Sequence, residues 1–122
     1  MKISFVGVVC VLSLACTSST SPIDGELRVN PAPPTLQLTN ESPAPVYILV
    51  IEARLAIRAN WAPCTDPALC RGIGVGATDE VAYTDIAGYT ESATHAIVYW
   101  WHLVPSGGGY EPDSIRAVGA EL

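Results

Sequence analysis

The chain has 122 residues and a formal net charge of −6, with twelve acidic and six basic side chains. This length suits a single domain. The acidic balance argues against nucleic acid and anionic lipid headgroups as partners, because the chain would repel both.

An uncharged apolar run opens the chain, from Ile3 to Ala15, directly after Lys2. A membrane-spanning helix needs about 20 apolar residues, so this run is too short to cross a bilayer. A positive start followed by such a run is typical of a secretory signal peptide. We therefore expect the chain to be exported.

The run ends in LSLAC, Leu12 to Cys16, which resembles the lipobox of bacterial lipoproteins, although Ser13 replaces the usual leucine. The resemblance implies cleavage after Ala15 and attachment of a diacylglycerol to the Cys16 thiol, which would anchor the chain in a membrane. Thr17 follows the cysteine in place of an aspartate, and this pattern resembles outer-membrane sorting in enterobacterial lipoproteins. The alternative is an ordinary signal peptide, cut near Ala15 without lipidation.

The resemblance implies a lipoprotein signal peptide at 1–15, a lipidated flexible tether at 16–27 and one folded domain at 28–122. It places the protein in the bacterial cell envelope, at the outer membrane and facing the periplasm. Without residues 1–15 the chain keeps five arginines and twelve acidic residues, a formal charge of −7. We therefore expect the membrane to be contacted through the lipid alone.

The four cysteines can be divided by their positions. Cys10 falls within the signal and Cys16 takes the lipid, so an exported chain retains Cys64 and Cys70 for a disulfide. The intervening TDPAL contains Asp66-Pro67, a turn former. Closing so small a loop should stabilise the fold by about 2 kcal/mol. The alternatives are a redox pair, which usually has C-x-x-C spacing, and a zinc site, which needs four ligands.

Alternating apolar residues and turn signals predict strands in the remaining chain. The second half of the 46–57 segment, EARLAI, could also form a helical turn, but we favour a strand with a bulge near Glu52. The 94–104 segment is apolar on both faces and should be central. The expected strands are 35–40, 46–57, 80–86, 94–104 and 114–122.

Short strands, long connections and no clear amphipathic helix predict an all-β fold, an antiparallel β-sandwich of about 5–7 strands. LQLTNESPAPV and the glycine-rich turn before EVAY are similar to strands of small bacterial immunoglobulin-like domains. That resemblance implies an immunoglobulin-like sandwich. The arrangement WAPC…C…GY…VYWWHLVP is also similar to bacterial lipoproteins of a family without assigned function.

Catalytic and metal-binding patterns are weak. His95 and His102 are an odd number of positions apart, so on one strand they face opposite sides and should not share a site. The sequence contains neither G-x-S-x-G nor a D-x-D-x-D-G calcium loop. We expect no metal, no cofactor and no enzymatic activity, and keep an enzyme with an acidic and histidine site as an alternative. The carboxylates considered for catalysis or calcium are Asp79, Glu80, Asp85, Glu91 and Asp113.

Aromatic residues offer the most suggestive surface. Trp100 and Trp101 are neighbours, so one should face the core and the other should face outward or lie under a loop. Tyr89 and Tyr110 are expected in adjacent loops, and a Gly107–Gly109 run precedes Tyr110. These four aromatic residues form the predicted binding surface, unless both tryptophans belong to the core.

The leading hypothesis is a non-enzymatic, lipid-anchored binding or accessory domain with an envelope protein as partner. A second hypothesis is a proteinase inhibitor that presents the loop between Cys64 and Cys70. A disulfide-braced loop would lose little conformational freedom on binding, which favours such a role.

Overall fold

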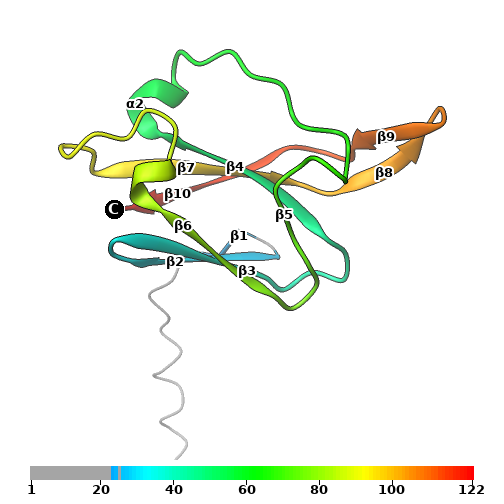
Figure 1. Cartoon of the computed structure of the whole chain (residues 1–122), viewed down its shortest axis with the longest axis horizontal. Coiled ribbons are helices and arrows are strands. Elements are labelled where there is room, and N and C mark those ends of the chain that lie inside the picture. Colours follow the sequence, from blue (N-terminus) through cyan, green and yellow to red (C-terminus); the bar gives the residue numbers. More distant parts are fainter. Residues whose placement is uncertain (1–22, 25) are drawn as a thin grey trace, which may run out of the picture.

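The structure is a computed structural model that describes residues 23–24 and 26–122 (Figure 1). The expected signal peptide, the lipidation site Cys16 and the first residues of the tether lie outside the described residues. No helix within the described part of the chain is long and apolar enough to cross a membrane.

Two four-stranded sheets make up most of the molecule. Sheet A has the order β1-β2-β3-β6, and sheet B has the order β10-β7-β4-β5. A separate hairpin, β8–β9, follows β7 and projects from one end of sheet B (Figure 1). Every pairing between these strands is antiparallel, which confirms the predicted all-β class. The strands are β1 (Ile23–Asp24), β2 (Leu27–Ala32), β3 (Thr35–Asn40), β4 (Val46–Glu52), β5 (Gly72–Ile73), β6 (Thr78–Ala82), β7 (His95–Trp101), β8 (Leu103–Ser106), β9 (Gly109–Pro112) and β10 (Arg116–Glu121).

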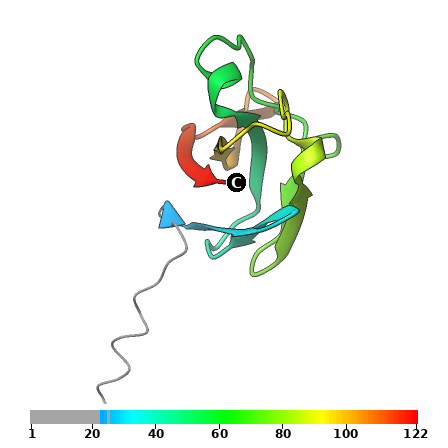
Figure 2. The ribbon, with the colours of Figure 1, turned by 90° about the vertical axis from the view of Figure 1, so that its left-hand side faces the viewer.

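The core lies between the two sheets, which form two layers in Figure 2. Alternate residues of each strand point into it, as the period of two along a β-strand requires. Trp100 is the largest side chain in this core and is fully buried. Sheet A contributes Leu27, Val29, Leu36, Leu38 and Val81, and sheet B contributes Val46, Ile48, Val50, Ile73, Ala96, Val98, Trp100 and Ala120.

A second apolar layer covers the other face of sheet B. Ile51 and Trp101 point away from the main core, yet they are only 3% and 2% exposed. The chain between β4 and β5 passes over this face (Figures 1 and 2). It begins with the short helix α2 (Ala53–Ala56) and continues through residues 57–71, here called the strap. Sheet B is therefore covered on both faces.

The segment expected as one strand over 46–57 divides at Glu52, so the extended strand was wrong and the helical alternative holds. The Glu52 side chain accepts a hydrogen bond from Leu55 N at 3.1 Å and one from Arg54 Nε at 3.1 Å, which caps the helix and replaces strand pairing. The helix packs against Gly88, which has φ +79. A Cβ on Gly88 would lie 2.7 Å from Leu55 Cδ2 and 3.0 Å from Leu55 Cβ, and the positive φ also disfavours a side chain, so glycine is strongly favoured there.

Other boundaries also differ from the expectation. The first long strand is β2, which starts at Leu27 and continues through Pro31, so the folded region begins before the boundary expected at residue 28. Strand β6 ends at Ala82, where a 3-10 turn (Tyr83–Asp85) begins. The strand expected over 94–104 stops at Trp101, and the glycine-rich segment after it forms the β8–β9 hairpin where we expected only a flexible loop.

Candidate functional site

The strap carries an aromatic residue onto the outer face of sheet B. The Trp61 ring lies 4.8 Å from the Tyr99 ring and 5.9 Å from the Trp101 ring, centroid to centroid. Trp101 Nε1 also donates a hydrogen bond to the Cys64 carbonyl oxygen at 3.1 Å. We call Trp61, Tyr99 and Trp101 the aromatic cluster. The aromatic cluster joins the strap to the sheet, and Trp61 and Tyr99 remain partly exposed to solvent.

The expected disulfide closes the end of the strap. Cys64 and Cys70 are bonded with an S–S distance of 2.04 Å and a Cα–Cα distance of 5.6 Å, which confirms the predicted pairing. Between them the chain is wound into a turn, because Asp66 O accepts hydrogen bonds from Leu69 N and Cys70 N at 2.9 Å each. The Asp66 carboxylate accepts a further bond from Ala68 N at 3.0 Å. Leu69 stands out from this turn with 80% of its surface exposed.

The structure does not bring the four predicted binding residues together. Trp100 is 0% and Trp101 2% exposed, so neither presents a ring to solvent. Tyr110 is 48% exposed on the β8–β9 hairpin, beyond the end of β7. Tyr89 precedes the start of β7 and packs on the core beside Tyr83, with ring centroids 6.0 Å apart. The loops of Tyr89 and Tyr110 therefore lie at opposite ends of β7, and are not adjacent as expected.

His102 belongs to a polar cluster at the hairpin end of the core. We define the cluster as Asn40, Ser42, His102 and Asp113. His102 Nε2 lies 3.0 Å from Ser42 Oγ, and His102 Nδ1 lies 3.4 Å from Asp113 Oδ2. The sequence of contacts, from serine to histidine to aspartate, resembles the contacts of the catalytic triad in serine hydrolases. Ser42 is only 3% exposed, however, and its hydroxyl also contacts Asn40 Oδ1 at 2.6 Å, so the hydroxyl is buried and bonded within the cluster.

The polar cluster is instead a set of satisfied contacts between the β3–β4 corner and the β8–β9 region. Burial acts to raise the pKa of Asp113, but hydrogen bonds from Ser114 N and His102 N and the nearby charges of His102 and Arg116 outweigh it, so the pKa is lowered. The Arg116 guanidinium lies 4.7 Å above the Trp100 ring. These contacts fix the geometry at this end of the sheet pair.

Two of the remaining titratable candidates, His95 and Asp79, have partners of their own in the described part of the chain. His95 contacts Thr94 Oγ1 at 3.0 Å and Glu121 at 3.9 Å, and it does not meet His102. Asp79 is paired with Arg71 at 2.9 Å. Within residues 23–24 and 26–122, no group of three histidine, cysteine or acidic residues could hold a metal ion.

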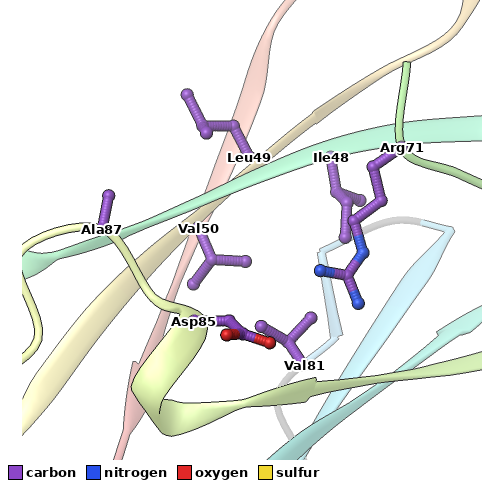
Figure 3. A pocket seen from close by; sticks show the side chains of 7 residues that line it. All are labelled: Ile48, Leu49, Val50, Arg71, Val81, Asp85 and Ala87. Atoms are coloured by element: carbon purple, nitrogen blue, oxygen red, sulfur yellow. The ribbon is translucent and has the colours of Figure 1, made fainter. Parts of the chain in front are cut away.

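A small pocket of about 180 Å³ opens beside β4 (Figure 3). Ile48 and Val50 point into it toward Val81, while the Leu49 side chain points to the other side of the strand. Arg71 and Asp85 flank the opening, but the Arg71 guanidinium already donates to Asp79 and to Glu80 O at 3.1 Å. The volume is below the range of about 300–1,000 Å³ usual for ligand sites. This pocket is therefore weaker than the aromatic cluster as a candidate site.

The sequence did not predict the role of Trp61, which stands three positions before Cys64. A tryptophan just before a disulfide loop could have suggested that the loop docks onto a sheet, but its target could not be read from the chain. The partnership of Ser42 with His102 spans 60 positions, and no local pattern signals it. No protein-family model matches this chain, and neither the curated proteins nor the solved structures contain a match to it.

Proposed function

We propose that this protein is an exported, lipid-anchored, non-enzymatic binding domain of immunoglobulin-like architecture. The strand order supports the architecture, because β2-β3-β6 faces β10-β7-β4-β5 across one core, as two antiparallel sheets do in that fold. The disulfide supports export, since such bonds persist in oxidising compartments. The apolar run and LSLAC motif support a lipid anchor at Cys16.

The aromatic cluster carries the proposal of binding. Trp61 is held on the sheet by two ring contacts and by the closed disulfide turn beside it, so it offers a rigid apolar surface at low entropic cost. Tyr47 and Leu49 lie on the same outer face of β4 and are also only partly buried. A partner protein of the envelope would contact this face, with Trp61 at the centre of the contact.

The test is capture of partners from envelope extracts by the wild-type chain and by Trp61→Ala. We expect the variant to lose the captured protein, because central aromatic residues typically contribute more than about 2 kcal/mol to binding. Tyr110→Ala is the matched control, since Tyr110 is exposed on the β8–β9 hairpin and makes none of the ring contacts of the aromatic cluster. Equal capture by both variants, with both still folded by circular dichroism, would remove the binding role of this face.

The lipid anchor is tested separately. Labelling with a radioactive fatty acid should mark the wild-type chain and fail on Cys16→Ser, which should leave the membrane fraction. A wild-type chain that stays unlabelled would contradict the anchor and leave the binding surface to be judged by capture alone.

Proteinase inhibition is a second candidate, favoured by Leu69, which is 80% exposed next to the disulfide. Against it, residues 66–70 are wound into a turn, whereas protease clefts hold an extended chain. A panel of proteases decides the matter: inhibition by the wild type and its loss in Leu69→Asp would favour this function over the first. No inhibition at micromolar protein would dismiss it.

A further inference from the structure

Strand β10 is an open edge of sheet B. It pairs with β7 on one side, and among residues 23–24 and 26–122 no other strand follows it in the order of sheet B. Strands β1 and β2 pass near β10, but they are hydrogen-bonded within sheet A. Antiparallel pairing uses alternate residues on each side of a strand, so half of the main-chain groups of β10 must point away from β7.

The hydrogen-bond pattern identifies which residues point outward. Leu122 N donates to Thr94 O at 2.9 Å, which places the even-numbered residues of this segment on the β7 side. The opposite edge of sheet B gives the same result. Ile48 N donates to Arg71 O, so the even-numbered residues of β4 face β5. The registers of β4 with β7 and of β7 with β10 then place the even-numbered residues of β10 on the β7 side. Ala117, Gly119 and Glu121 therefore turn their N–H and C=O groups to the open edge, and no described residue bonds to them.

The side chains leave this edge accessible. Ala117, Gly119 and Glu121 are all exposed, and two of them are the smallest residue types. Natural edge strands are commonly protected by charged residues, especially lysine, by proline or by a bulge. The charged residues of β10, Arg116 and Glu121, stand only at its two ends. The six residues of β10, RAVGAE, contain neither lysine nor proline, and β10 pairs with β7 in unbroken register. An extended strand could pair along the whole of β10.

We infer that β10 is an interface for a second copy of this chain, with two β10 strands antiparallel about a twofold axis at Gly119. Gly119 then faces Gly119 of the second copy, and Ala117 faces Glu121 of the second copy. Each of the three outward residues has one donor and one acceptor, and this register pairs all of them. Sheet B would continue into the second copy as an eight-stranded sheet, twice its present four strands.

Self-complementarity favours a second copy over an unrelated strand. The twofold register places Val118 opposite Ala120 on the inner face, both apolar, and sets no charged residue directly opposite a like charge. Gly119 has no side chain to clash at the axis. Glu121, the one acidic residue on the outward side, faces a small neutral alanine. An isologous contact of this kind uses the same surface on both copies, so no different partner protein is required.

The test measures the mass of the protein in solution, purified as its host exports it, with detergent micelles in excess over protein. Sedimentation equilibrium should show a monomer passing to a dimer between about 10 µM and 1 mM, as expected for a small interface. Hydrogen exchange at Ala117, Gly119 and Glu121 should slow over the same range. Amides that already face β7 should not change.

Variants separate this interface from other modes of association. Gly119→Pro removes an outward N–H but leaves the β7 ladder intact, and should weaken the dimer by at least about thirtyfold. Gly119→Ala keeps the N–H and is its matched control. Ala117→Glu should weaken the dimer, and Ala117→Lys should strengthen it, by about two- to thirtyfold through paired contacts with Glu121.

Each outcome bears on the inference. A monomer throughout the concentration range overturns it, and an unchanged dimer in Gly119→Pro shows that another surface associates. A dimer that responds to Gly119→Pro but not to the charge at position 117 overturns the register centred on Gly119. Because Trp61 is not part of β10, failure here leaves the proposed binding role of the aromatic cluster standing.

Discussion

Replacing Asn40 with alanine should produce one of the largest losses of stability in this fold. Asn40 is fully buried at the corner between β3 and β4. Its side-chain amide donates to Ala44 O at 2.8 Å and to Ile73 O at 2.9 Å. Its side-chain oxygen accepts from Ser42 N at 2.8 Å and from Ser42 Oγ at 2.6 Å. One side chain thus joins the corner to β5 of the opposite sheet.

The magnitude follows from these four contacts. Each is worth about 1 kcal/mol net, and Asn40→Ala would also leave Ser42 N and Ile73 O buried without these partners. We expect the free energy of unfolding to fall by about 3–5 kcal/mol, measured by urea unfolding of the oxidised protein. Asn40→Asp should do no better, because its second oxygen would face two carbonyl oxygens. Asn60→Ala, at an exposed position of the strap, is the control and should change stability by less than about 0.5 kcal/mol.

If Asn40→Ala lowered the free energy of unfolding by less than about 1 kcal/mol, the corner would not depend on this amide. The connection between this corner and β5 would then come from main-chain bonds, such as those of Asn40 with Gly76 and Ala77, and from apolar packing.

Three further changes test other parts of the structure. Reduction of Cys64–Cys70, or the double serine variant, should lower the free energy of unfolding by about 2 kcal/mol in urea titrations, and no change would mean that the loop is equally restrained without the bond. Because the pKa of Asp113 is lowered on folding, its carboxylate stabilises the fold above the unfolded value of about 3.9, and this contribution is lost as pH falls through the folded pKa. Asp113→Asn should therefore flatten the loss of stability on acidification, and an unaltered pH profile would contradict that assignment. Gly88→Ala should cost about 2–4 kcal/mol by thermal unfolding, while Gly74→Ala, with open space around it, should cost little; similar losses in both would refute the packing argument.

Local alternation was enough to predict strands whose two faces differ. The segment 35–40 was predicted with the bounds it has, because TLQLTN alternates without interruption and ends at a corner. The 46–57 segment was extended too far, because alternation continues through residues that Glu52 winds into a helix by capping Leu55 N. Strand β2 was not among the expected strands; it contains Pro31, and proline is tolerated where a strand needs no donor.

The candidate site was predictable only in part. The disulfide was predicted by assigning each cysteine from its position in the chain, which needs no knowledge of the fold. Alternation correctly placed Trp100 and Trp101 on opposite faces, and Trp100 is the one in the core, but alternation did not decide whether Trp101 would be exposed or lie under a loop. Contacts such as Trp61 on Tyr99 depend on the path of a long connection, which no periodicity encodes.

The placement of Trp100 and Trp101 on opposite faces of β7 means that two neighbouring indoles report on two separate apolar layers. Emission from the inner indole follows the separation of the two sheets, whereas the outer indole becomes hydrated when the strap lifts from Tyr99. Variants that keep only one tryptophan can therefore compare the point at which the strap separates from sheet B with the point at which the two sheets unfold. An outer signal that shifts first during denaturation would identify the strap as a unit that opens independently of the rest.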